Sequence, residues 1–338
     1  MEINQNMLRE RAVKLPDITN NMWNKINQEN KDLFDEYFES NAQLSLSTKK
    51  QYISGMKQFF WYINVRCKNK PMYEITKRDF IKYISFLTEH GLASKSIGFK
   101  KSSVSTLCNF IENIIMYDDT SGKYDNFRNF TRGMPKIPEN QVYDKSLISE
   151  EEYNLMMSVL EEKENYLYMA WLATAYHVGA RKAGIIQFKT EILDYDMVVD
   201  KNGNTQNYIL SNVVREKGFG LDGSQKRYMI NRDALKYMKL WVENRGFDNE
   251  YIFSHKIDGK IKLVSKQWAN YLCHDILSPI ICRRVTPHAF KANLISQKLI
   301  EGHDLKVVSK YIALHKDTAV TTKFYDLRSD DEETNKLF

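Results

Sequence analysis

Residues 286–325 read TPHAFKANLISQKLIEGHDLKVVSKYIALHKDTAVTTKFY, and this stretch is the part of the sequence that decides the fold. Thr286 is a suitable N-cap, and Pro287 suits the first position of a helix because its missing N–H has no partner there anyway. His288 and Lys291 follow three residues apart, so we expect both on one face of the first turn. The free N–H groups of that turn favour an anion.

The second half of the stretch carries His315 and, ten residues later, Tyr325. Gly302 predicts the end of the first helix, since glycine is favoured just past a helix end. Taken singly, these residues also have ordinary interpretations. A histidine at a helix start is commonly a surface histidine, and tyrosine is abundant in this chain, with 20 copies.

Two basic features lie upstream. Arg181 stands in ATAYHVGARKAGIIQF (173–188), after an apolar helix pattern and a glycine, where an arginine is either a structural ion-pair residue or an anion ligand. The segment VVREKGFGLDGSQKRYMI (213–230) predicts two antiparallel strands around a glycine-rich turn, with Lys217 before the turn and Lys226 and Arg227 after it. Basic residues on a hairpin can reach a nucleic acid, although a polar hairpin tip is the ordinary alternative.

The order of these residues resembles the tyrosine recombinase (phage integrase) family. The resemblance covers residues of about 40–328 and is most specific in the last 45 residues of that span, where TPH, Gly302 and the paired Thr321-Thr322 precede the tyrosine. It places the family's catalytic groups on Arg181, Lys217, His288, Lys291, His315 and Tyr325.

In that family the tyrosine hydroxyl attacks a DNA phosphodiester and forms a 3′-phosphotyrosyl link, without a metal or a cofactor. The resemblance therefore implies Tyr325 as the nucleophile, Arg181 as a phosphate ligand and Lys217 as the general acid, with Lys226 as a second candidate for the acid. The histidines would bind phosphate or transfer protons. We expect no cofactor and no metal site.

The departures from the family pattern concern the same site. Lys291 stands where the family has its second arginine, and a lysine offers a point charge instead of a bidentate fork. Gly184 replaces the acidic residue that usually follows the first arginine by three positions. The usual Leu-Gly-His reads Ala313-Leu314-His315, and the interval from His315 to Tyr325 is one residue longer than the common one, which would displace the tyrosine.

The first hundred residues predict short helices and a basic surface. Residues 49–101 hold twelve Lys or Arg against three acids, although such a run can also be an ordinary solvated surface. We expect helix starts at Ser47-Thr48, Thr76 and Ser94. By resemblance, the DNA contacts are expected from Thr48, Lys49, Lys95, Ser96, Lys100, Lys101, Arg181, Lys226, Arg227, His288 and Lys291.

The expected fold is mainly α with a small antiparallel β-sheet, an α+β tyrosine-recombinase fold that closes on duplex DNA as a C-shaped clamp. From residue 232 to 325 we expect helix. The expected parts are an N-terminal helical extension (1–40), a helical core-binding domain (41–118), a linker rich in Asp, Gly and Pro (119–146), a catalytic-type domain (147–328) and an acidic tail (329–338).

Composition excludes several classes of protein. Hydrophobic residues make up 43% and charged residues 27%, a globular balance, and 14 Gly and 6 Pro are few for an all-β protein. No long apolar run or signal peptide is present, so we expect a cytoplasmic protein without membrane contact. The four cysteines form no C-x-x-C pair, which argues against a zinc cluster.

Two functions remain open. The altered site favours a phage or prophage transcriptional repressor with an integrase fold that binds double-stranded DNA at a specific sequence and has lost strand cleavage. The chain also resembles the integrase-fold repressors of lysogeny of SPbeta-like Bacillus prophages. The alternative is an active tyrosine site-specific recombinase. For a repressor, further expected partners are a second copy of the chain on DNA and a phage-encoded regulator or antirepressor.

Overall fold

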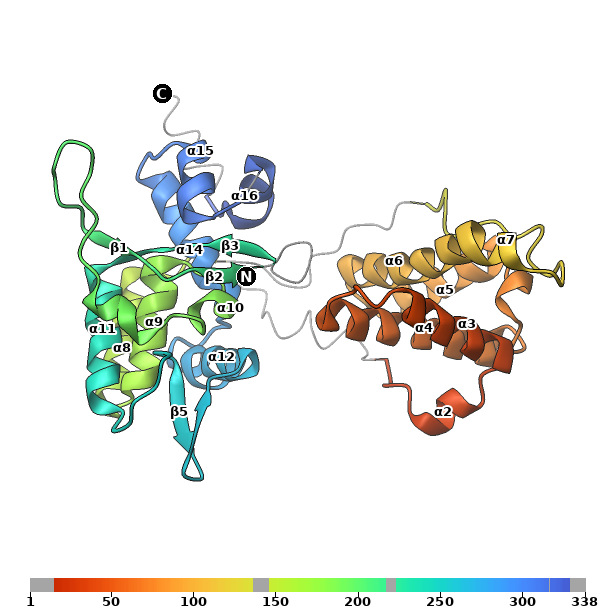
Figure 1. The fold of residues 1–338 in the computed structure, drawn as a ribbon, viewed down its shortest axis with the longest axis horizontal. Helices are drawn as coiled ribbons and strands as arrows, with labels where there is room; N and C mark the ends of the chain where they lie inside the picture. The colour runs from red at the N-terminus through yellow and green to blue at the C-terminus, as the bar shows by residue number, and fades with distance from the viewer. Residues whose placement is uncertain (1–14, 136–145, 217–222, 316, 329–338) are drawn as a thin grey trace. The chain divides into compact units, whose positions relative to one another are not determined.

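The computed structural model describes residues 15–135, 146–216, 223–315 and 317–328, and the chain divides into two compact units, Met1–Asp144 and Lys145–Phe338 (Figure 1). The described part of the first unit is helical. Its elements are α2 (Asn20–Asn24), α3 (Gln28–Ser40), α4 (Leu46–Arg66), the 3-10 turn η1 (Met72–Glu74), α5 (Lys77–Glu89), α6 (Ser94–Phe110), the π-helical turn η2 (Ile111–Ile115) and α7 (Met116–Asp118).

Side-chain caps explain where these helices begin. Thr76 and Asp79 form a reciprocal capping box at the start of α5, where the sequence predicts a helix to begin. Helix α4 begins earlier than expected, because the hydroxyl of Ser45 accepts the N–H of Thr48 at 3.2 Å and caps the helix there. Thr48 and Lys49 therefore lie in the first turn of α4 and not at its cap.

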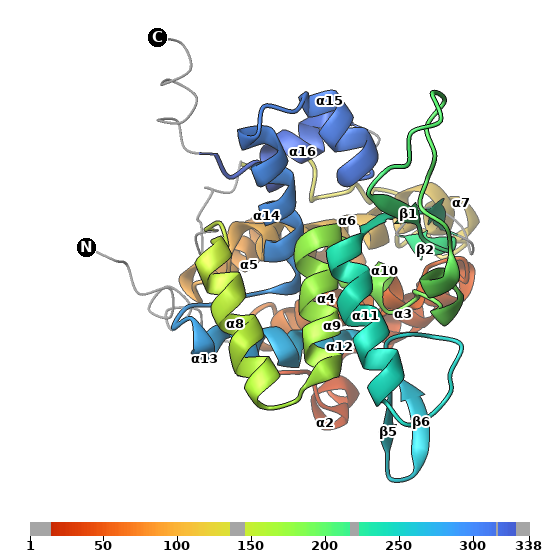
Figure 2. The same ribbon diagram turned by 90° about the vertical axis from the view of Figure 1, so that its left-hand side faces the viewer.

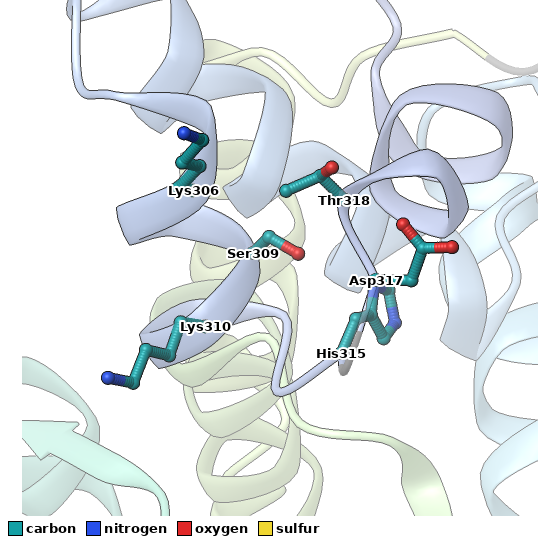
Figure 3. A pocket seen from close by; sticks show the side chains of 6 residues that line it. All are labelled: Lys306, Ser309, Lys310, His315, Asp317 and Thr318. Atoms are coloured by element: carbon teal, nitrogen blue, oxygen red, sulfur yellow. The ribbon is translucent and has the colours of Figure 1, made fainter.

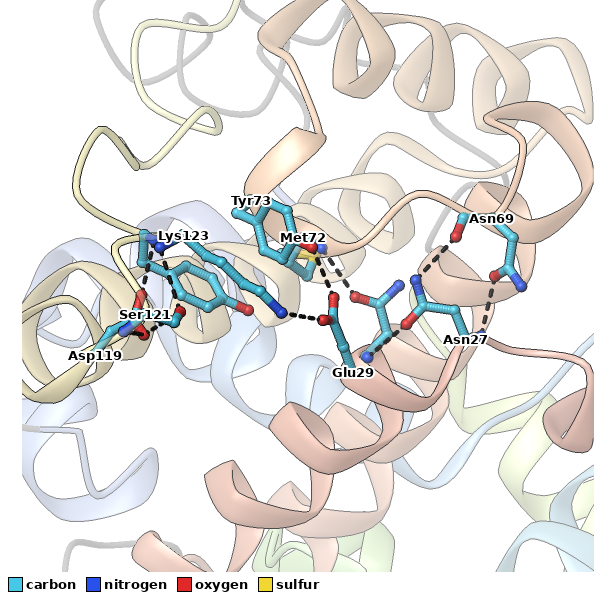
Figure 4. Close-up of polar contacts among 10 residues, drawn as sticks. Asn27, Glu29, Asn69, Met72, Tyr73, Asp119, Ser121 and Lys123 are labelled. Carbon is cyan, nitrogen blue, oxygen red and sulfur yellow. Dashed lines mark hydrogen bonds and ion pairs between the residues drawn. The ribbon is translucent and has the colours of Figure 1, made fainter.

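The first unit includes segments that the sequence suggested were outside it. Phe34 and Tyr37 of α3, expected as an extension, are buried in its core. Phe127 and Phe130, from the expected linker, are buried in the same core. Polar contacts hold the two segments together, since Glu29 accepts from the hydroxyl of Tyr73 and from the ammonium of Lys123 (Figure 4). The expectation of a linker beginning at residue 119 was wrong for residues 119–135, because burial of two aromatic rings stabilises this segment on the helices.

The described part of the second unit combines helices with three two-stranded sheets. Its elements are α8 (Glu150–Glu162), α9 (Tyr166–Val178), α10 (Lys182–Ile185), the 3-10 turn η3 (Thr190–Asp194), β1 (Tyr208–Leu210), β2 (Val214–Glu216), β3 (Ser224–Lys226), β4 (Met229–Asn231), α11 (Arg232–Asn244), β5 (Ser254–Ile257), β6 (Lys260–Leu263), α12 (Lys266–Tyr271), the π-helical turn η4 (Leu272–Leu277), α13 (Ser278–Ile280), α14 (Pro287–Ile300), α15 (Leu305–Val307), the π-helical turn η5 (Val308–Ile312) and α16 (Thr318–Tyr325).

Helix α9 lies at the centre of the second unit. It is apolar all round, and almost all of its residues are buried, including Trp171. Helices α8, α11 and α14 pack around it (Figure 2). A helix without a polar face is stable only when covered in this way, so α9 is the element against which the unit's core forms.

The strands confirm one expectation and correct another. Strand β2 pairs antiparallel with β3 around the glycine-rich turn, as the sequence of 213–230 predicts. Strand β1 pairs antiparallel with β4. The expectation of helix throughout 232–325 was wrong, because β5 and β6 form a hairpin there. Its turn contains Asp258 and Gly259, a dipeptide that favours the tight turns of hairpins.

The C-terminal segment has a small core of its own. Ile295 and Leu299, near the end of α14, are buried against Val308 and Ala313, with Tyr325 packed at the side. Phe290, one turn earlier on α14, belongs to the main core of the unit. Within the described residues no helix is long and apolar enough to cross a membrane.

Candidate functional site

Arg181 is held in a polar network at the start of α10. It follows Gly179, whose backbone is left-handed (φ +61°) and where a Cβ would lie 2.8 Å from Leu294. The guanidinium donates from Nη1 to Oε2 of Glu216 at 3.0 Å. Burial lowers the pKa of Arg181, but the charges of Glu216 and neighbouring tyrosines outweigh burial and raise the pKa overall. Arg181 is therefore always positively charged, and its guanidinium is held in place at Nη1 by Glu216.

Glu216, at the end of β2, is the anion of this network and was missed by the sequence analysis. Its side chain is only 3% exposed, whereas that of Arg181 is 26% exposed. The other carboxylate oxygen accepts from the hydroxyl of Tyr228 at 2.6 Å. The available signal was strand alternation, because Glu216 shares the buried face of β2 with Val214 while Arg215 faces solvent.

Lys291 lies on α14, whose first turn is built as expected, with Thr286 as N-cap and Pro287 at the first position. The lysine is fully buried, and its ammonium donates to the carbonyl of Ala313 at 2.7 Å. Burial, together with the positive charge of Arg181, lowers the pKa of Lys291 to about 7. Its position is thus that of a buried cation directed at the backbone of the C-terminal segment.

His315 and Tyr325 pack against each other beside Lys291. The centroids of their rings are 4.9 Å apart, and the ammonium of Lys291 lies 5.7 Å from the centroid of the tyrosine ring. The extra residue between His315 and Tyr325 therefore does not carry the tyrosine away from the cluster. Leu314 has a left-handed backbone (φ +54°) where the family pattern has glycine, a conformation that costs a leucine about 1 kcal/mol.

A hydroxyl pair fixes the tautomer of His315. Its Nδ1 lies 2.9 Å from the hydroxyl of Thr321, which donates onward to Ser309 at 2.8 Å, so Nδ1 is the ring donor. Burial and the charges of Lys291 and Arg181 lower the pKa of His315 to about 4. At neutral pH the imidazole is therefore uncharged, and Nε2, which has no hydrogen-bond partner among the described residues, is an acceptor.

A pocket of about 550 Å³ adjoins this cluster through His315. Figure 3 shows its lining residues, which come from α15, η5, the connection after η5 and the start of α16: Lys306, Ser309, Lys310, His315, Asp317 and Thr318. The carboxylate of Asp317 accepts the N–H of Ala319 and caps α16. The pocket is thus lined by two lysines and by Asp317, the N-cap of α16. Its lining includes His315 but not Arg181.

The remaining expected site residues are distributed differently. His288 is exposed while Lys291 is buried, so their spacing of three does not give them a shared environment. Lys226 pairs with Val214 in the β2–β3 ladder, and Arg227 is exposed, with its guanidinium donating to the carbonyl of Ser211 at 3.3 Å. Lys217 lies outside the described residues, directly after Glu216.

In the first unit the expected contact residues lie on two helices, α4 and α6. Thr48 and Lys49 are half-buried on α4, whereas Lys95 and Ser96 are exposed on the first turn of α6. Lys100 differs from its neighbours, because its ammonium donates to Gln58 and burial lowers its pKa.

One face of α6 is open at Gly98. A Cβ added at Gly98 would meet no atom within 4 Å, so the backbone of α6 is uncovered there. Lys95 and Lys101 lie three residues before and after this glycine, which places all three on one face. The face carries positive charge and no bulky side chain between the lysines.

Comparison with known proteins supplies a relative that spans the chain. The SPbeta prophage-derived recombinase-like protein YomM of Bacillus subtilis (strain 168) is 46% identical over 337 residues, covering 99% of this chain and 98% of that protein. No family model matches the sequence.

Solved structures with the same fold share little sequence. The integrase of transposon Tn1549 in complex with transposon right end DNA has a TM-score of 0.64 at 15% identity, covering 91% of this chain and 98% of that one. A lambda integrase dimer bound to a COC′ core site has a TM-score of 0.62 at 15% identity, covering 89% and 78%. XerH recombinase bound to a palindromic difH substrate has a TM-score of 0.64 at 13% identity, covering 98% and 93%.

Proposed function

The chain belongs to the tyrosine recombinase (phage integrase) family, and we propose that it is a sequence-specific double-stranded DNA-binding protein that acts as a prophage transcriptional repressor and has lost strand cleavage. Its partner is duplex DNA, whose phosphates are bound by Arg181 in the second unit and by the lysines of α4 and α6 in the first. Phosphate contacts position such a protein and supply much of its affinity.

The observation that carries this proposal is the state of Lys291. A cleavage site needs donors directed at the oxygens on which negative charge develops. Lys291 occupies the place of the second arginine, yet it is fully buried and its ammonium donates to the carbonyl of Ala313. His315, uncharged at neutral pH and donating through Nδ1 to Thr321, also has no N–H to offer from Nε2. Binding a phosphate through Arg181 does not require either group.

We expect the lysines of α6 in the first unit to contact DNA phosphates, and removing their charges tests this role. Replacing Lys95 and Lys101 with alanine should weaken binding to specific and random duplexes alike, because phosphate contacts carry no sequence information. Each lost contact should also reduce the slope of log affinity against log salt by about 0.9. Fluorescence anisotropy with labelled duplexes over a salt series measures both quantities.

Lys25 and Lys31 provide the matched control. They lie in the same unit but outside the basic stretch, on α2–α3, and their replacement with alanine removes the same charge. We expect this control to retain nearly the parent salt slope. Equal loss in both double variants would mean that only net charge matters and that the face of α6 is not a DNA contact.

An active site-specific recombinase remains the second candidate, because one observation favours it. Despite the longer interval, Tyr325 lies beside Lys291 and His315. A nucleophile in place could still attack a phosphodiester if DNA binding rearranged its neighbours. The two functions differ in a single product, a covalent protein–DNA adduct.

Tyr325→Phe separates these functions. The substitution removes only the hydroxyl and keeps the ring that packs on His315. If the protein is a repressor, the parent chain should give no covalent adduct with nicked suicide substrates made from its own binding site. DNA affinity and repression should also be nearly equal in parent and variant. A denaturing gel detects the adduct, and a reporter gene measures repression.

Tyr311→Phe is the matched control, since Tyr311 is exposed on η5 in the same C-terminal segment. An adduct formed by the parent chain and by Tyr311→Phe, but absent from Tyr325→Phe, would overturn the repressor proposal and establish the recombinase. It would also mean that a buried lysine can take the place of the second arginine.

A further inference from the structure

The space beside Gly184 is filled by the carboxylate of Glu216. A Cβ added to Gly184 would lie 2.8 Å from Oε1 of Glu216 and 3.1 Å from the ring of Tyr228. Only a residue without a side chain leaves room for this carboxylate between α10 and β2. Gly184 has an ordinary helical place, three residues after the N-cap of α10, so its backbone does not itself require glycine.

Both oxygens of the Glu216 carboxylate are used. Oε2 accepts from Nη1 of Arg181 at 3.0 Å, and Oε1 accepts from the hydroxyl of Tyr228 at 2.6 Å. The carboxylate is buried, whereas the guanidinium keeps part of its surface exposed. An arginine has five N–H donors in a rigid plane, so fixing one edge on a buried acid orients the others.

We infer that Glu216 is a positioning residue for the DNA phosphate ligand Arg181, supplied from β2 through the space that Gly184 leaves open. This inference rests on the proposed binding of a DNA phosphate by Arg181. It assigns two linked roles, a carboxylate that orients the guanidinium and a glycine that admits the carboxylate. Neither role requires strand cleavage.

The direction in which Glu216→Ala changes DNA affinity distinguishes a positioning role from a simple effect of charge. Glu216→Ala removes a negative charge near DNA, which on charge alone should tighten binding. If Glu216 positions Arg181, the same variant should instead bind a random-sequence duplex of about 25 base pairs at least tenfold more weakly, because the charged hydrogen bond to phosphate is lost. Its salt slope should fall by about 0.9, as for Arg181→Ala.

A relocated carboxylate provides the rescue. An aspartate oxygen lies about 2.4 Å from its own Cβ, so Asp at position 184 can place an oxygen close to where Oε1 of Glu216 stands. In Gly184→Asp alone, two carboxylates would occupy one buried space, and stability and DNA binding should both fall. In the combined variant Gly184→Asp with Glu216→Ala, most of the affinity and the parent salt slope should return.

Three outcomes decide the matter, each measured by anisotropy on full-length variants whose folding is checked by circular dichroism and melting. Rescue in the combined variant, with no further loss when Arg181→Ala is added to Glu216→Ala, supports the inference. Unchanged or tighter binding by Glu216→Ala, while Arg181→Ala weakens binding, overturns the inference and leaves the proposed DNA binding intact. Unchanged binding by Arg181→Ala overturns both. If Glu216→Ala fails to fold, the DNA affinity of Glu216→Gln is measured instead and compared with those of the parent and Arg181→Ala in the same way.

Discussion

Arg181→Ala is expected to lower both the stability of the protein and its affinity for DNA. Removing the guanidinium leaves Glu216 as a buried carboxylate without its cation, and breaking such a pair costs on the order of 3 kcal/mol of unfolding free energy. DNA affinity should fall by about 1.5–3 kcal/mol, the range for a hydrogen bond to a charged group. Urea unfolding and fluorescence anisotropy measure the two losses separately.

The double variant Arg181→Ala with Glu216→Ala is the control for this prediction. It removes the uncompensated carboxylate, so stability should largely return while DNA affinity stays low. If Arg181→Ala instead leaves the unfolding free energy at the parent value, Glu216 does not depend on its partner, and the ion pair is not a structural element of the second unit.

Lys291→Met is expected to raise stability in a pH-dependent manner. The folded-state pKa of Lys291 is lowered from 10.5 to about 7, so between these values the folded protein binds fewer protons than the unfolded chain. Burying the charged lysine therefore lowers the free energy of unfolding by its full amount below about pH 7. This loss disappears as the pH rises toward 10.5. Methionine removes this cost, so its advantage at about pH 7 should exceed that at about pH 9.5 by roughly 3 kcal/mol.

Lys298→Met is the matched control on the same helix, because Lys298 is partly exposed and paired with Glu301. Its effect on unfolding free energy should be nearly the same at both pH values. The two variants are compared by urea unfolding at each pH. A pH-independent effect of Lys291→Met would show that the lysine is solvated or paired in the folded protein.

Helix starts could be predicted from the sequence because they depend on neighbouring residues. The caps Thr76 and Thr286 each accept the N–H of the residue three positions later, and both stand where the sequence places them. The β5–β6 hairpin was missed although Asp258-Gly259 marks its turn, because the helical patterns on either side were extended across it.

The site could be predicted only in part. The order of Arg181, His315 and Tyr325 indicated the cluster, and the structure brings His315 and Tyr325 together. Glu216 could not be assigned, because its contact with Arg181 spans 35 residues and depends on the space beside Gly184. The absence of an acid at position 184 therefore did not mean that the arginine lacks one.

Because the C-terminal segment has its own small core, we expect the two parts of the site to differ in local stability. Arg181 and Glu216 lie beside residues of the main core, whereas Tyr325 packs on the small cluster that joins Val308 and Ala313 to the end of α14. Because this cluster is small, we expect the segment to open at a free energy below that of global unfolding. Such an opening would move Tyr325 away from Arg181 while Arg181 keeps its place on the main core, so we expect binding of DNA and assembly of the full cluster to be separate events.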